Sequence, residues 1–197
     1  MNRLLRGITA VAAFSTAFSA AALTTIAVVG QTHGTPARFT ALAVNMADVG
    51  PARSDMVEIV VTRWSTHDER DMLIGTLFDR GPEAFLDEVR GTGSVGYIRS
   101  AGSLRYELRF TQETLGGDGT RRIMLVTDRP IGPWETRTLD YPFIVIELRV
   151  NRDGDGDGTM WSAARITGNP EFNLMEIEDY AIQPVRLMAV YSSRPGT

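Results

Sequence analysis

Hydrophobic and polar residues alternate along most of the chain from about residue 38 onward. The alternating segments are 38–46, 56–64, 94–99, 104–113, 121–128, 143–150, 160–166, 173–177 and 182–191. A period of two predicts β-strands that bury one face and expose the other to water. Strands of a parallel sheet are buried on both faces, so this pattern favours an antiparallel sheet. Turn residues between the segments predict a barrel or sandwich of eight to nine short strands.

Two of these segments carry charged residues on the predicted polar face. In 104–113, one face is expected to hold Leu104, Tyr106, Leu108 and Phe110, and the other Arg105, Glu107 and Arg109. In 143–150, one face is expected to hold Ile144, Ile146, Leu148 and Val150, and the other Glu147 and Arg149. We interpret the five charged residues as a cross-strand ladder that faces water. The alternative is that they line the inside of a wide barrel and bind an anionic ligand.

The pattern changes to a helical period between residues 66 and 90. Thr66 and Glu69 have the spacing of a capping box, in which each side chain satisfies a backbone N–H of the other residue. Gly81 and Pro82 interrupt the helical stretch, because glycine ends helices and proline is favoured at a helix start. The segment therefore predicts a helical hairpin at about 66–90, laid over one end of the sheet. The fold class is mainly β, or α+β by element count.

The N-terminal 30 residues have the pattern of a secretory signal peptide. A short basic segment, 2–6, is followed by an uncharged run, 8–29, that is rich in alanine. We expect cleavage after Gly30, which leaves residues 31–197 as a single β-rich domain in the periplasm or outside the cell. An uncleaved membrane anchor is the alternative, because the run is long enough to cross a bilayer. After cleavage no membrane contact is expected.

Composition removes several kinds of chemistry. The chain has no Cys, two His and 20 basic residues, all of them Arg. Disulfides, cysteine nucleophiles, Schiff-base lysines and multi-histidine metal centres are therefore excluded. The formal net charge of −4 argues against a nucleic-acid partner. Carboxylates such as Glu58, Glu107 and Glu147, working with arginines, are what remains for a hydrolase.

An alternating Asp-Gly segment lies at 151–159. Carboxylates at alternate positions can supply oxygen ligands to calcium, and here they would be Asp153, Asp155 and Asp157, with Thr159 adding a backbone carbonyl. The segment lacks the closing bidentate Glu of an EF-hand loop, because that position is Ala164. Asp-Gly is also favoured hairpin-turn chemistry, so we weigh a plain polar turn against a calcium site. No other cofactor is expected.

The stretch Thr62–Glu135 resembles small secreted bacterial β-rich proteins of unassigned function. The resemblance rests on the segments TRWST, VGYIR, LRYELRF and RRIMLVTDRPI. It implies export and no particular activity. No combination of nucleophile, base and orienting group is visible, so we predict a non-enzymatic binding or structural module of the cell envelope. Its partner would be a small molecule or an envelope protein. The alternatives are a carboxylate/Arg hydrolase or anionic-ligand-binding barrel, and a calcium-stabilised interaction domain.

Overall fold

The computed structural model describes residues 35–45, 54–101, 103–128, 143–169, 174–180 and 184–193. The predicted signal peptide, 1–30, lies outside these residues. The described strands are β1 (Ala37–Val44), β2 (Ser54–Val61), β3 (Gly96–Ser100), β4 (Tyr106–Leu108), β5 (Phe110–Leu115), β6 (Arg121–Thr127), β7 (Phe143–Val150), β8 (Asp155–Asn169), β9 (Leu174–Tyr180) and β10 (Val185–Ser193). Helix α1 (His67–Gly91) lies between β2 and β3.

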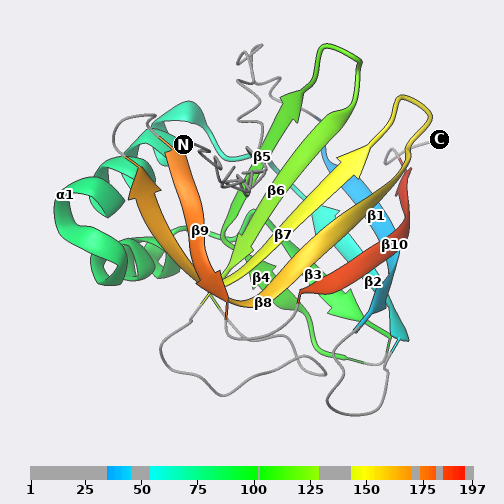
Figure 1. The fold of residues 1–197 in the computed structure, drawn as a ribbon, viewed down its shortest axis with the longest axis horizontal. Coiled ribbons are helices and arrows are strands. Elements are labelled where there is room, and N and C mark those ends of the chain that lie inside the picture. The colour runs from blue at the N-terminus through cyan, green and yellow to red at the C-terminus, as the bar shows by residue number, and fades with distance from the viewer. Residues whose placement is uncertain are drawn as a thin grey trace, which may run out of the picture.

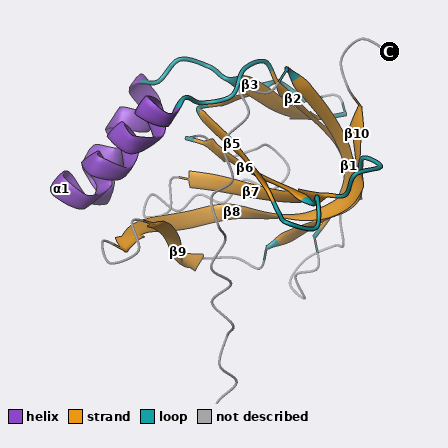
Figure 2. Cartoon of the chain, turned by 90° about the horizontal axis from the view of Figure 1, so that it is seen from above, coloured by secondary structure: helices purple, strands orange, loops and turns teal. Residues whose placement is uncertain are grey.

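The strands form one antiparallel sheet that curls into a nearly closed barrel (Figure 1). Their order is β4-β3-β2-β1-β10-β8-β7-β6-β5, and β9 pairs with the second half of β8. Figure 2 shows the strands arranged around a common centre, with α1 at one side. The structure therefore confirms the antiparallel, mainly β prediction and shows a barrel-like arrangement rather than a sandwich.

A bend at Arg109 brings the two ends of the sheet together. The Leu108 carbonyl still accepts the Val95 N–H at 2.9 Å beside β3, while the Arg109 N–H already bonds the Val126 carbonyl of β6 at 2.8 Å. Residues 104–113 are therefore not the single alternating strand that the sequence predicted. Leu104 precedes β4 and is 81% exposed, whereas Leu108 faces the barrel core. Phe110 packs in a different cluster, because the bend reverses which side the residues face.

The interior of the barrel is lined by apolar side chains from every strand of the sheet except β5 and β9. Its largest fully buried members are Phe39, Ile59, Ile98, Leu108, Ile123, Leu125, Ile144 and Ile146. They occupy alternate positions along their strands, as the period-two pattern requires. Burial of this apolar surface is the main stabilising contribution to the barrel.

A second apolar core lies outside the barrel, between the sheet and α1. The helix contributes Leu73, Leu77, Phe85 and Val89, and the sheet contributes Phe110, Val126, Phe143, Val145, Ala164 and Ile166. Residues 143–146 of β7 are consequently buried on both faces. The predicted polar face of this segment is therefore wrong for its first half, because the helix covers it. It is correct only from Glu147 onward.

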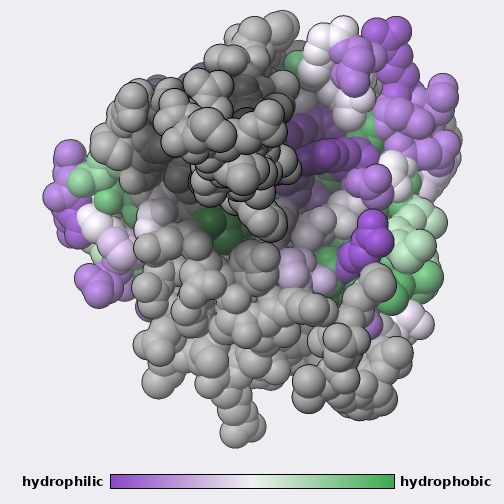
Figure 3. Space-filling view, in the orientation of Figure 1, coloured by the Kyte–Doolittle hydropathy of each residue, from purple (hydrophilic) through white to green (hydrophobic). Residues whose placement is uncertain are grey.

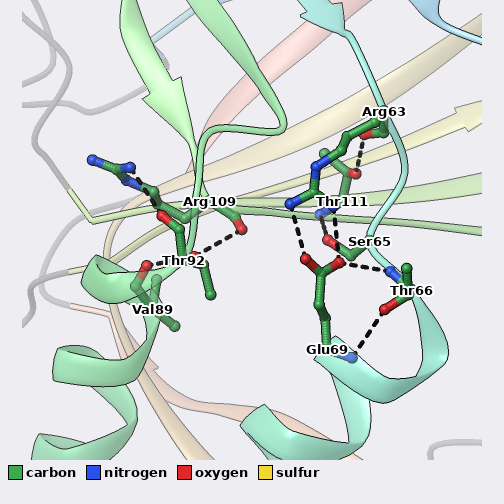
Figure 4. A network of polar contacts seen from close by, with 8 residues as sticks. All are labelled: Arg63, Ser65, Thr66, Glu69, Val89, Thr92, Arg109 and Thr111. Atoms are coloured by element: carbon green, nitrogen blue, oxygen red, sulfur yellow. Dashed lines mark hydrogen bonds and ion pairs between the residues drawn. The ribbon is translucent and has the colours of Figure 1, made fainter.

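Helix α1 consists of two helical stretches joined at a kink, where the sequence predicted a break. Gly81 has a φ of 82° inside the helix, a conformation that glycine adopts without strain, and Pro82 follows it. The capping box is confirmed: the Glu69 N–H donates to Thr66 Oγ1 at 3.1 Å, and the Thr66 N–H donates to Glu69 Oε2 at 2.8 Å (Figure 4). The two helical stretches that the sequence predicted are therefore present, joined at Gly81 and Pro82 within α1.

The helix start is also tied to the barrel wall. Arg63 donates two hydrogen bonds to the Glu69 carboxylate, both at 2.9 Å, and the Arg63 carbonyl accepts from Thr111 Oγ1 of β5 (Figure 4). Ser65 pairs with Thr111 through a backbone bond of 3.1 Å, and Thr111 is fully buried. This network fixes the helix against the closing strand of the barrel.

We expect Glu69→Gln to lower the free energy of unfolding by about 1 kcal/mol at pH 7. The hydrogen bonds from Arg63 hold the pKa of Glu69 below its usual 4.5. A depressed folded-state pKa stabilises the fold above about pH 4.5, and this contribution disappears as the pH falls through the lower folded value. Urea denaturation should therefore separate variant and wild type at pH 7, and the two should converge in stronger acid. Glu83→Gln, an exposed position on the same helix, is the control.

Candidate functional site

The five predicted ligand-binding residues do not form one site. Arg105 and Glu107 are exposed, on the outside of the barrel at β4, and the Arg105 guanidinium lies 4.4 Å from the centre of the Tyr97 ring. Glu147 and Arg149 lie on the outer face of β7, which pairs with β6 and β8 and not with β4. None of these four side chains faces the barrel interior, so they do not line an internal anion site.

Arg109, the fifth predicted residue, joins the end of α1 to the sheet. Its side chain donates to the Thr92 carbonyl at 3.1 Å and to Asp128 Oδ1 at 3.3 Å. The Thr92 hydroxyl in turn donates to the Val89 carbonyl at 2.6 Å, at the last turn of the helix (Figure 4). The Asp128 side chain is only 7% exposed. Arg109 therefore occupies a structural junction at the point where the barrel closes.

Glu147 holds two arginines together on the outer face of β6 and β7. Arg122 and Arg149 are direct cross-strand neighbours, an arrangement that repels two like charges. The Glu147 Oε1 atom lies 3.0 Å from Arg122 Nε and 2.8 Å from Arg149 Nε. Its hydrogen bond, with Asp157 nearby, raises the pKa of Arg149. Hydrophilic side chains gather over this part of β6 and β7 in Figure 3. This cluster has the form of the predicted charge ladder.

A second triplet of the same kind lies on the other side of the barrel. Glu58 of β2 accepts from Arg38 of β1 and from Arg99 of β3, which flank it in the sheet. Two arginines thus share one carboxylate, as they do at Glu147. Sequence analysis did not single out Arg38 or Arg99, because the pairing of distant strands is what brings them to Glu58.

The Asp-Gly segment forms a short turn followed by a strand. Asn151 Oδ1 accepts the N–H groups of Asp153 and Asp155 at 2.9 and 3.0 Å, which completes the turn. From Asp155 the chain is extended and paired with β7 and β10. Asp155, Asp157 and Thr159 point outward along the strand, so they do not curl around a common point. Among the described residues, no group of three acidic or His side chains could hold a metal ion.

Close packing of the strands explains the alternation of aspartate and glycine in this segment better than calcium binding does. Gly156 pairs with Val150 and Val190, and Gly158 pairs with Leu148 and Leu187, all four of which are buried in the barrel core. A Cβ atom on Gly156 would lie 1.9 Å from the Arg149 carbonyl oxygen. Glycine is therefore required on the inner side, where two backbones approach closely, and aspartate is tolerated on the outer side.

A charged pair that sequence analysis missed faces the barrel interior. Arg121 pairs with Leu115 and Val150 in the sheet, and Glu113 pairs with Ile123, so both share the inner face with core residues. Arg121 Nε donates to Glu113 Oε1, and Arg121 Nη1 donates to Ser192 Oγ at 3.4 Å. The period-two pattern separates Arg121 from Arg122, since neighbours on a strand face opposite sides. Only the register shows which of the two faces inward.

In the part of the chain that the structure describes, the geometry defines a small antiparallel barrel with one external helix and with several arginines bound to carboxylates. No family model matches the chain, and neither a curated protein nor a solved structure is similar to it. Within the described ranges, no helix is both long and apolar enough to cross a membrane.

Proposed function

We propose that the chain is an exported, non-enzymatic module of the cell envelope that assembles with a second copy of itself. The observation that carries the proposal is an apolar row on the outer face of β2, β1 and β10. Export is supported by the basic segment and the uncharged run at 2–29. The filled apolar barrel favours contacts made from the outside over a ligand held deep within.

The arrangement of the carboxylates argues against a hydrolase. A catalytic carboxylate needs access to the substrate. Glu58 and Glu147 are each bridged by two arginines, which occupy the carboxylate oxygens. Among the described residues, His67 is exposed at the start of α1. These groups support a structural role.

The proposed contact surface is the methionine row, defined as Met56, Leu42 and Met188. These three residues are direct neighbours across β2, β1 and β10. Met56 is 52% exposed and Met188 49% exposed, and Tyr191 nearby on β10 is 54% exposed. Figure 3 shows hydrophobic side chains at this edge of the molecule. Methionine and tyrosine are enriched at the centres of protein interfaces, where methionine adapts its shape to the partner.

A β-bulge places these side chains on the same face. The register of β10 shifts between Leu187 and Val190, and Ala189 within the shift has a φ of 48°. Met188 and Tyr191 both remain exposed while Leu187 and Val190 stay in the barrel core. A positive φ at a non-glycine residue is strained, and such bulges recur where a protein presents side chains for function.

The charges beside the row are complementary to a second copy. Arg186 lies on one side of the row, and Tyr191 lies on the other side next to Asp155 of β8. A two-fold axis along the row exchanges the two sides. Arg186 of one copy then meets Tyr191 and Asp155 of the other, where a cation–π contact and an ion pair are both favourable. The same face therefore complements itself.

Sedimentation velocity of the full chain between about 1 and 100 μM tests this assembly. We expect a dimer that Met188→Glu converts to a monomer, because the substitution places a charge in the apolar centre. Arg186→Asp and Asp155→Arg should each weaken the dimer, and the double variant should restore it. Met72→Glu, at an exposed methionine of α1, is the matched control and should leave the dimer intact.

A wild-type chain that stays monomeric at the highest concentration contradicts the proposal. A dimer that is unchanged by Met188→Glu, in protein whose circular dichroism is native, also contradicts it. Failure of the double charge reversal to restore the dimer overturns the two-fold arrangement.

A further inference from the structure

The Arg121–Glu113 pair differs from the outer-face triplets because it lies inside the barrel near one end. The Arg121 side chain is 26% exposed and that of Glu113 is 13% exposed, whereas Ile123, two residues further along β6, is fully buried. The pair therefore marks the depth at which the apolar interior meets solvent. Placing charges here costs desolvation that an apolar pair would avoid, so packing of the barrel does not itself require them.

The guanidinium of Arg121 is fixed on two sides. Glu113 binds its Nε atom, and the ring of the fully buried Phe39 lies 5.9 Å from its central carbon. Both contacts restrict the side chain to one orientation. An arginine that is already ordered loses little further entropy when its remaining N–H groups bind a ligand.

The remaining edge of the guanidinium faces small residues. Its Nη1 atom reaches Ser192 Oγ only at 3.4 Å, which is long for a charge-assisted hydrogen bond. Beside Ser192 lies Gly154, whose carbonyl accepts the Ser192 N–H at 2.7 Å and which has no side chain. Nη1 is therefore held by one long hydrogen bond, and neither Ser192 nor Gly154 has a large side chain that would block access to it.

We infer that Arg121 and Ser192 form a binding site for the carboxylate of a small ligand at this end of the barrel. The two Nη groups of an arginine match the two oxygens of a carboxylate, and the Ser192 hydroxyl is placed to donate to one of them. The long Arg121–Ser192 bond is then exchanged for shorter, charge-assisted bonds. Glu113 acts as a positioning residue that orients the guanidinium.

The neighbouring charge favours a carboxylate over a phosphate. Glu113 lies against the same guanidinium, and its negative charge repels a doubly charged phosphate more than a singly charged carboxylate. The site is separate from the proposed dimer surface, because Ser192 shares its face with Phe39 inside the barrel while Tyr191 points outward. The two proposals can therefore fail independently.

Chemical-shift titration of the ¹⁵N-labelled full chain with sodium hexanoate tests the site, with hexylammonium chloride and inorganic phosphate as comparison probes. We expect saturable shifts at the amides of Arg121 and Ser192 with hexanoate, and weaker or no shifts with the other two. Arg121→Gln should lower the affinity about tenfold or more, and Ser192→Ala about threefold to tenfold. Arg122→Gln changes the adjacent residue on the outer face and should leave the affinity unchanged.

Absence of saturable hexanoate shifts overturns the inference, as does binding that survives Arg121→Gln. Equal loss in Arg122→Gln means that binding follows general surface charge and also overturns it. Tighter binding of phosphate than of hexanoate contradicts the carboxylate assignment. If Arg121→Gln does not fold, Arg121→Lys and Ser192→Ala decide: the first keeps the positive charge but loses the two-pronged geometry, the second removes only one hydroxyl, and both should bind more weakly than wild type.

Discussion

Gly156→Ala should destabilise the protein by about 3 kcal/mol or more, which is a large effect for the addition of one methyl group. The new Cβ would lie 1.9 Å from the Arg149 carbonyl oxygen and 3.0 Å from Val150 Cα. Both atoms belong to the backbone of β7, so no flexible side chain can move aside. Relief requires separation of β7 and β8, which are paired from Phe143 and Ala164 to Val150 and Gly156. Urea denaturation monitored by tryptophan fluorescence measures the loss.

Gly117→Ala is the matched control for this prediction. Gly117 lies in the β5–β6 turn, and a Cβ atom there would meet nothing within 4 Å. We expect its free energy of unfolding to change by less than about 0.5 kcal/mol. If Gly156→Ala were as harmless as Gly117→Ala, the close approach of β7 and β8 would be wrong, and the Asp-Gly segment would again need a ligand-based explanation.

Phe85→Ala should cost about 3 to 5 kcal/mol, because it removes a large buried side chain and leaves a cavity. Phe85 is 2% exposed, and its ring centre lies 5.3 Å from that of Phe143 in β7. The pair joins the second half of α1 to the outer face of the barrel. Thermal or urea denaturation gives the magnitude, and hydrogen exchange should show that the amides of α1 open more readily than those of β2.

Met72→Ala provides the comparison within the same helix. Met72 is 45% exposed and does not belong to the core between helix and sheet, so we expect a change of less than about 0.5 kcal/mol. A small effect of Phe85→Ala would mean that the helix does not depend on this core. The barrel would then have to hold α1 through the Arg63–Glu69 and Arg109–Thr92 contacts alone.

The sequence predicted those parts of the fold that depend on local patterns. The period-two segments gave the antiparallel strands, and Thr66 with Glu69 gave the start of α1, because both signals are complete within a few residues. The bend at Arg109 was missed. Nothing in LRYELRF marks the residue at which the chain leaves one strand neighbour for another, since that depends on where β3 and β6 lie.

The candidate sites depended more strongly on distant pairing, and so they were harder to predict. The ladder at Glu147 was anticipated from alternation, but its second arginine, Arg122, comes from a strand paired with β7. The inner position of Arg121 and the row of Met56, Leu42 and Met188 both follow from register. The Asp-Gly segment left a turn and a calcium site open, because one composition serves ion binding, turns and closely packed strands. Only the positions of Gly156 and Gly158 against β7 distinguish these uses.

The pairing of β1 with β10 has a consequence for when the barrel can form. The first described strand, β1, has the last described strand, β10, as one of its two neighbours. Leu42 therefore cannot pair with Met188, or Phe39 with Ser192, before β10 is available. Long-range pairing of this kind slows folding, because the entropy cost of closing a large loop comes before the stabilising contacts that offset it. If the chain is exported in an unfolded state, as we propose, this delay is useful. The sheet cannot be completed until β10 has emerged, so the topology disfavours premature folding during transit.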